Sequence, residues 1–138
     1  MQEHTTNYYG TFIEVAEDCP SQAGVAPAQK EPKTIAAIQF ELISAHPYVY
    51  TSDDVIFETY YRRQTLTGDK AALRKEYFAT GRACMRSSPL AKTYGWGIHA
   101  NGEGRIAIVA RGTAEYNRLV NDATIVHLKA MRSKRASV

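Results

Sequence analysis

The sequence predicts a single domain of the α+β class over residues 1–138, with a mostly antiparallel sheet and three to four helices packed on it. The chain of 138 residues has the length of one ordinary domain. Apolar residues recur at a period of about two in some segments and about 3.6 in others, which are the periods of strands and helices. Two strand-like segments also flank a short turn, and such a hairpin favours α+β structure over a doubly wound parallel sheet.

The N-terminal third of the chain contains a predicted strand, a long loop and a predicted helix. Apolar and polar side chains alternate over Thr11–Ala16, which is typical of a strand. Three prolines and one glycine occupy residues 20–32 and predict a long loop. Over Thr34–Ala45 the large apolar residues fall at helical spacing. Pro47 ends this predicted helix, because the residue before a proline avoids helical geometry.

The middle of the chain is predicted to form a second strand and two further helices. After the turn-forming run Thr51–Asp54, residues 55–62 carry mostly apolar or aromatic side chains at every second position, which predicts a strand. Asp69 can cap a helix over residues 69–80. Ser88 followed by Pro89 is typical of a helix start, so a short helix is predicted over residues 89–94.

The C-terminal third begins with a predicted hairpin over residues 96–110. Its turn, Asn101–Gly104, consists of residues that tolerate the positive φ angles of hairpin turns. A helix is predicted over residues 113–121, with Thr113 as its cap. Residues 124–131 are compatible with either a strand or a helix.

The composition is that of an ordinary globular protein. Hydrophobic residues make up 44% of the chain and charged residues 22%, which gives no indication of disorder. The N-terminal residues are polar and include an acid, unlike a signal peptide. No apolar run approaches the roughly 18 residues that cross a membrane. We therefore expect a cytoplasmic protein that makes no contact with a membrane.

The positive charge is concentrated at the C-terminus. The formal net charge is +3, and subtracting the charges of Lys129, Arg132, Lys134 and Arg135 leaves −1. Residues 132–138 are accordingly predicted to form a basic, frayed tail. A nearly neutral body argues against nucleic acid as a partner, because a nucleic-acid-binding face needs a basic stripe across the fold.

Cysteine and histidine are too scattered to predict a metal site. The two cysteines, Cys19 and Cys84, are far apart, and the sequence contains no Cys-x-x-Cys pair and no cluster with zinc spacing. Gly-x-Gly-x-x-Gly and Walker-type phosphate loops are also absent from the sequence. We predict neither a metal nor a cofactor.

Residues 81–99 contain the best candidate for a ligand site. The start of the predicted short helix offers free N–H groups to an anion, and cationic side chains lie beside it. The candidate ligand-binding residues are Arg86, Ser87, Ser88, Lys92, Tyr94 and Trp96. The alternative is that Ser88 merely caps a surface helix and that Arg86 is solvated.

Cys84 and His99 are the candidates for catalytic residues. A cysteine near cations and a helix start has a lowered pKa, and His99 could act as its base if the chain folds back through the short helix. Nothing in their spacing forces the two side chains together. The alternative is a buried, structural Cys84.

Several stretches of the sequence carry a resemblance to one family. They are Thr5–Tyr9, Phe12–Pro20, Tyr50–Asp54, Ser88–Leu90, Lys92, Tyr94–His99 and Lys129–Arg135. Together they resemble a family of small bacterial proteins catalogued only as a domain of unknown function, over nearly the whole chain. The resemblance implies a single-domain bacterial protein and assigns no catalytic residue. Gly10 departs from the pattern, in which a polar residue, aspartate, is expected.

Three hypotheses for the function follow. The first is a binding module for a small anionic ligand at Arg86, Ser87 and Ser88. The alternative is a structural or interaction protein, such as a homodimer, that uses the tyrosine-rich strand at residues 55–62 and the basic tail as contact surfaces. The third is a thiol-dependent enzyme with Cys84 and His99.

Overall fold

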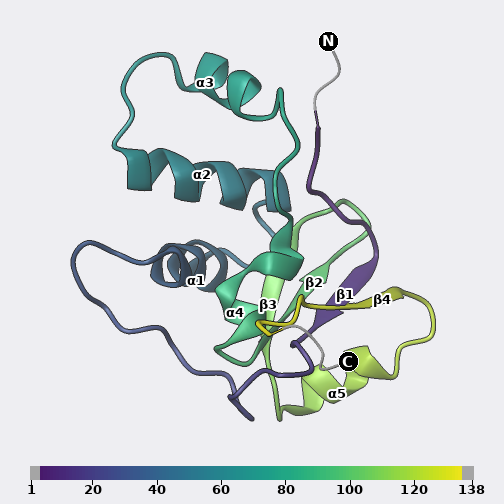
Figure 1. Ribbon diagram of the computed structural model, residues 1–138. Coiled ribbons are helices and arrows are strands. Elements are labelled where there is room, and N and C mark those ends of the chain that lie inside the picture. Colours follow the sequence, from purple (N-terminus) through teal and green to yellow (C-terminus); the bar gives the residue numbers. More distant parts are fainter. Residues whose placement is uncertain (1–3, 135–138) are drawn as a thin grey trace.

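The computed structural model describes residues 4–134, which form one four-stranded sheet and five α-helices, the single α+β domain that the sequence predicts (Figure 1). The strands are β1 (Thr11–Glu14), β2 (Trp96–Ala100), β3 (Ile106–Ala110) and β4 (Val126–Lys129). The α-helices are α1 (Ile35–Ala45), α2 (Ser52–Gln64), α3 (Lys70–Tyr77), α4 (Pro89–Lys92) and α5 (Ala114–Val120). A 3₁₀ helix, η1 (Met85–Ser87), directly precedes α4.

The sheet has the order β3-β2-β1-β4 and is mixed. The predicted hairpin is present as the antiparallel pair β2–β3, and β1 pairs antiparallel with β2. The ambiguous C-terminal segment is strand β4, which pairs parallel with β1, so that Ile13 lies opposite Leu128. Two of the three pairings are therefore antiparallel.

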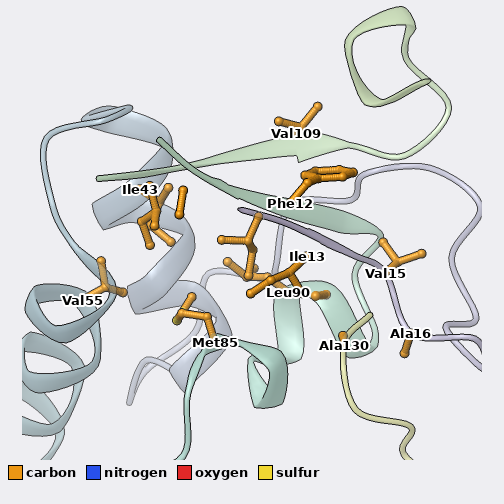
Figure 2. Close-up of a cluster of buried hydrophobic side chains, with 14 of the residues drawn as sticks. Phe12, Ile13, Val15, Ala16, Ile43, Val55, Met85, Leu90, Val109 and Ala130 are labelled. Atoms are coloured by element: carbon orange, nitrogen blue, oxygen red, sulfur yellow. The ribbon is translucent and has the colours of Figure 1, made fainter. Parts of the chain in front are cut away.

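The core fills both faces of the sheet (Figure 2). Phe12 on β1 is fully buried and packs edge-to-face on Tyr116 of α5, with 5.1 Å between the ring centroids. The next residue, Ile13, points to the opposite face, where Met85 and Leu90 lie (Figure 2). This alternation puts α5 on one face and α1 with α4 on the other.

The strand predicted over residues 55–62 is wrong, because these residues lie in helix α2. Thr51 and Asp54 form a capping box: the Thr51 side chain accepts from the Asp54 N–H, and the Asp54 carboxylate accepts from the Thr51 N–H. Such a box starts a helix, and Val55, Ile56 and Thr59 then form its buried face at helical spacing. Residues 55–62 consequently offer no strand as a contact surface for a partner.

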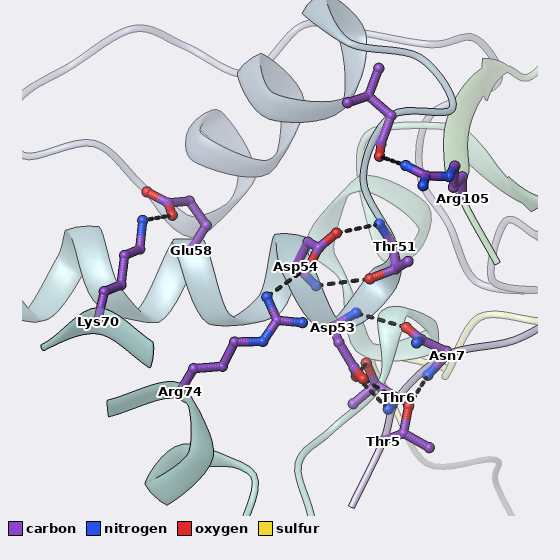
Figure 3. A network of polar contacts seen from close by, with 11 residues as sticks. Thr5, Thr6, Asn7, Thr51, Asp53, Asp54, Glu58, Lys70, Arg74 and Arg105 are labelled. Atoms are coloured by element: carbon purple, nitrogen blue, oxygen red, sulfur yellow. Dashed lines mark hydrogen bonds and ion pairs between the residues drawn. The ribbon is translucent and has the colours of Figure 1, made fainter. Parts of the chain in front are cut away.

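The N-terminal segment is fastened to the start of α2 by Asp53 (Figure 3). The Asp53 carboxylate accepts hydrogen bonds from the Thr5 hydroxyl at 2.8 Å and from the Thr6 hydroxyl and N–H at 2.7 Å. The Asp53 N–H donates in turn to the Asn7 side chain at 2.9 Å. We call Thr5, Thr6, Asn7 and Asp53 the N-terminal clamp. It fixes the path of the chain into β1.

Ion pairs hold α3 against α2. Arg74 pairs with Asp54 at 2.7 Å, and Lys70 pairs with Glu58 (Figure 3). Helix α2 lies between α1 and α3 (Figure 1). Among the described residues, no helix has the length and apolar run that crossing a membrane requires.

The predicted loop at residues 20–32 has neither helix nor strand and lies against β2. The Trp96 indole N–H donates to the Val25 carbonyl at 2.9 Å. At the other end of the chain, Arg132 bonds to Glu17, and the N–H groups of Ser133 and Lys134 bond to Asp18. The first three residues of the predicted frayed tail are therefore attached to the domain. Residues 135–138 lie outside the described residues.

Candidate functional site

A pocket of about 250 Å³ opens between α1, α2, Tyr77 of α3 and the segment that leads through η1 into α4. Its lining consists of Ile35, Gln39, Ile56, Thr59, Tyr60, Arg63, Gln64, Tyr77, Ala83, Cys84, Met85, Ser87, Ser88 and Pro89. An engineered protein cavity of about 150 Å³ holds one benzene molecule. The pocket therefore has room for a single ring with a substituent.

The lining of this pocket combines apolar walls with a few hydrogen-bonding groups. Ile35, Ile56 and Met85 supply aliphatic surface. Arg63 is the one charged residue among the described residues that line it, and no carboxylate lines it. Ligand sites in proteins commonly have this character, with an apolar wall and few polar groups that set orientation.

Gln39 presents an unused donor to the pocket. The residue is only 6% exposed, and its Oε1 accepts from the Ser88 hydroxyl at 2.6 Å. Its Nε2 has no hydrogen-bond partner among the described residues. Among the same residues, every fully buried side-chain nitrogen or oxygen does have a partner. The Nε2 must therefore border accessible space, and the space that Gln39 lines is this pocket. An amide N–H held in this way calls for an acceptor.

Two tyrosine rings form the aromatic wall. The centroids of Tyr60 and Tyr77 are 4.4 Å apart, with 35° between the ring planes. The guanidinium of Arg82 also lies over the ring of Tyr77, 3.9 Å from the ring centroid. Burial raises the pKa of Tyr77; Arg82 acts in the opposite direction, and Tyr60 adds to the rise. The Tyr77 phenol is consequently neutral at physiological pH.

Cys84 lines the same pocket and contacts Tyr8. The Cys84 Sγ and the Tyr8 hydroxyl oxygen are 3.1 Å apart, and either group can donate. Burial, and then the hydrogen bond to Cys84, raise the pKa of Tyr8 to about 12, although Arg86 acts to lower it. Cys84 is partly exposed, whereas Cys19 is only 5% exposed and donates to the Ser21 carbonyl.

The six predicted ligand-binding residues are distributed over several places. Ser87 and Ser88 line the pocket, and Ser88 caps α4 by accepting from the Leu90 N–H at 3.2 Å. Arg86 lies in another hollow beside β4, where its Nε donates to the Lys129 carbonyl at 2.7 Å. No free N–H group remains in the first turn of α4, because Pro89 has none and those of Leu90, Ala91 and Lys92 all bond to Ser88.

The remaining three of these residues lie on α4, on β2 and in the turn between them. Lys92 is half-buried in the last turn of α4. Tyr94 packs against the core, and its carbonyl accepts from the Val25 N–H at 2.9 Å. Trp96 packs edge-to-face on Phe40, with 5.4 Å between the ring centroids. Tyr94 and Trp96 thus contact the loop at residues 20–32 and are not among the residues that line the pocket.

Cys84 and His99 form no hydrogen bond with each other in the structure. The Nδ1 of His99 bonds to the Tyr48 hydroxyl at 2.8 Å. On the sheet, His99 pairs with Phe12, so it faces α5, whereas Cys84 lies on the face of α1 and α4. Burial, followed by the charge of Arg118, lowers the pKa of His99. Within residues 4–134, no three His, Cys, Asp or Glu side chains gather as a metal site.

The residues that the sequence analysis missed come from α1, α2, α3 and the N-terminal segment: Gln39, Tyr60, Arg63, Tyr77 and Tyr8. Thr51 and Asp54 contain the signal that could have found two of them. Their spacing is that of a capping box, and a helix starting there puts residues 60 and 63 three positions apart on one face.

The fold and the pocket define a single-domain α+β protein with a ligand-sized pocket among its helices. A family model matches residues 3–136, and the chain belongs to that family, DUF6157, described as a family of unknown function. This confirms the resemblance found in the sequence, and the family supplies no residue roles. Comparison with curated proteins gave no match, and comparison with solved structures gave none.

Proposed function

We propose that this protein is a binding module of the bacterial cytoplasm for a small, ring-sized molecule that carries a carboxylate. The observation that carries the proposal is Gln39, a residue that is 6% exposed and whose amide has an unused donor beside a pocket of about 250 Å³. Because this donor borders the space of the pocket and has no protein partner, an acceptor on a ligand there can bond to it.

The charge of the pocket favours an anion. Arg63 forms no ion pair with any described residue, and no carboxylate lines the pocket to compete for it. A guanidinium grips a carboxylate through two parallel hydrogen bonds. The exposed Ser87 hydroxyl offers a further donor at the rim.

The walls of the pocket favour a ring as the body of the ligand. Tyr60 and Tyr77 present aromatic surface, and Ile35, Ile56 and Met85 present aliphatic surface. Aromatic rings pack well in offset or edge-to-face contact with such a wall. The proposal retains Ser87 and Ser88 from the sequence analysis and gives Arg63 the role of the cation.

Replacing Arg63 tests this proposal. Benzoate and a series of substituted benzoates should raise the unfolding midpoint by several degrees at saturating concentration, and the neutral benzamides should do so less. Titration calorimetry on Arg63→Ala should show benzoate affinity reduced roughly tenfold or more, because a charge-assisted hydrogen bond is lost.

Lys75→Ala is the matched control, since it also removes one positive charge but lies outside the pocket, on exposed α3 surface. Its benzoate affinity should equal that of the unaltered protein. Equal affinities of Arg63→Ala and Lys75→Ala, or a flat response to the whole benzoate series, would contradict the proposal.

A further inference from the structure

We propose that the Cys84 thiol adds reversibly to a carbonyl carbon of the bound ligand, with Tyr8 relaying the proton, so that the pocket captures small carboxylates that carry an aldehyde. This inference rests on the proposed function, since it needs a ligand held in the same pocket.

The placement of Cys84 is the first support. Its side chain is partly exposed and borders the pocket into which Gln39 directs an unpartnered amide donor. The thiol therefore faces a space that independently calls for an acceptor-bearing molecule. Cys19 shows the contrast, because its thiol is buried and its hydrogen bond goes to a backbone carbonyl.

Tyr8 supplies the second group that the reaction needs. Its hydroxyl lies 3.1 Å from the Cys84 Sγ. With a pKa raised to about 12, the phenol stays protonated at physiological pH, so it has a proton to exchange for that of the thiol. The N-terminal clamp holds the residues just before Tyr8 through Asp53 and so fixes the path of the backbone that leads into Tyr8 (Figure 3).

The groups at the site favour addition over other thiol reactions. No imidazole or carboxylate lines the pocket among the described residues, so nothing there resembles the base of a hydrolytic thiol site. Addition to a carbonyl group needs no oxidant and no leaving group. It therefore suits a site that offers a thiol and a neutral phenol.

The step is balanced in atoms and protons. The Cys84 Sγ forms a bond to the carbonyl carbon, and the π electrons of the carbon–oxygen bond move to the oxygen. The thiol proton passes to the Tyr8 oxygen, and Tyr8 gives its own proton to the carbonyl oxygen. The product is a hemithioacetal, and Tyr8 ends in the state in which it began.

Access to the thiol is tested first. Iodoacetamide applied to the native protein should alkylate Cys84 and leave Cys19 unmodified until the protein is unfolded, as read from the masses of the proteolytic peptides. A Cys84 that stays unmodified in the native protein would overturn the inference.

The covalent step is tested with 3-formylbenzoate labelled with ¹³C at the aldehyde carbon, and with 3-(hydroxymethyl)benzoate as its unreactive counterpart. In the unaltered protein and in Cys19→Ser, the aldehyde resonance should be replaced by that of a tetrahedral carbon bonded to sulfur. Cys84→Ser should lose this signal while still binding the alcohol, which shows that its pocket is intact. Tyr8→Phe should form the adduct several-fold more slowly.

The outcomes separate this inference from the proposed function. If the alcohol binds in a manner that depends on Arg63 but the labelled carbon gives the same spectrum in the unaltered protein and in Cys84→Ser, covalent capture is wrong and the binding module stands. If neither probe binds, both proposals fail. An adduct that persists in Cys84→Ser would assign the reaction to another group and overturn the inference.

Discussion

At the scale of single residues, the same residue type has different properties because its surroundings differ. His99 is half-buried and bonds to Tyr48, whereas His127 is exposed and bonds to the Asp122 carbonyl. Burial is the main cause that lowers the pKa of His99, and the charge of Arg118 adds to it; Glu115 and Asp122 act in the opposite direction. The folded protein thus favours the neutral imidazole.

This shift predicts a dependence of stability on pH. Since the pKa of His99 is lower in the folded protein than its ordinary value of 6.5, the unfolded chain binds the proton more readily. The contribution of His99 to stability is therefore complete above about pH 6.5 and decreases as the pH falls below it. Urea denaturation between pH 8 and pH 5 should show this decrease in the free energy of unfolding. In His99→Asn the free energy of unfolding should fall less over the same pH range.

His127→Asn serves as the control for that experiment, because it removes an exposed imidazole at the edge strand β4. Its stability should keep the pH dependence of the unaltered protein. A decrease that is the same in both variants would show that His99 is not its source.

At the scale of secondary structure elements, the capping box of α2 determines more than one helix. The Thr51 hydroxyl and the Asp54 carboxylate satisfy N–H groups at the start of α2. Asp54 also pairs with Arg74 and so ties α3 to α2 (Figure 3). Because Tyr60, Arg63 and Tyr77 come from these two helices, the cap helps to build the pocket.

Loss of this cap should destabilise the protein. Thr51→Ala is expected to lower the free energy of unfolding by about 0.5–2 kcal/mol, the usual cost of removing a capping side chain. Thr67→Ala changes an exposed threonine in the connection between α2 and α3 and should have little effect. Chemical denaturation followed by circular dichroism measures both, and equal stabilities would contradict the role of the cap.

At the scale of the whole molecule, the two faces of the sheet separate two environments. One face carries α5 with His99 and Tyr48, and the other carries α1, α4 and the pocket. The face toward α5 depends on close packing at Gly97 of β2. A Cβ at this position would lie 2.6 Å from the Phe12 ring and 2.8 Å from the Tyr116 ring.

Gly97→Ala should therefore disturb the packing of α5 on the sheet. We expect a loss of about 1–3 kcal/mol in the free energy of unfolding, as for other overpacked cores. Gly102→Ala in the hairpin turn is the control, because nothing lies within 4 Å of the added Cβ, and its effect should stay within about 0.5 kcal/mol. Thermal unfolding of both variants measures the difference, and an unchanged Gly97→Ala would contradict this account.

Local patterns were sufficient for much of the fold. The spacing of apolar residues predicted α1, the Ser88-Pro89 pair predicted the start of α4, and the Asn101–Gly104 run predicted the turn of the hairpin. These signals act through contacts within a few residues, so a sequence displays them directly. The error at residues 55–62 arose because the prediction followed the alternating side chains and passed over the capping box at Thr51 and Asp54, which starts a helix.

The sequence by itself determined the α+β class, most of the helices and the hairpin, and the family, because these depend on neighbouring residues. Only the tertiary structure decided the site. Gln39, Arg63, Cys84 and Tyr8 come from four separate segments that packing brings together. The same packing directs His99 to the other face of the sheet, since neighbouring strand residues point in opposite directions. The spacing of residues along the chain does not show which side chains from separate segments come into contact.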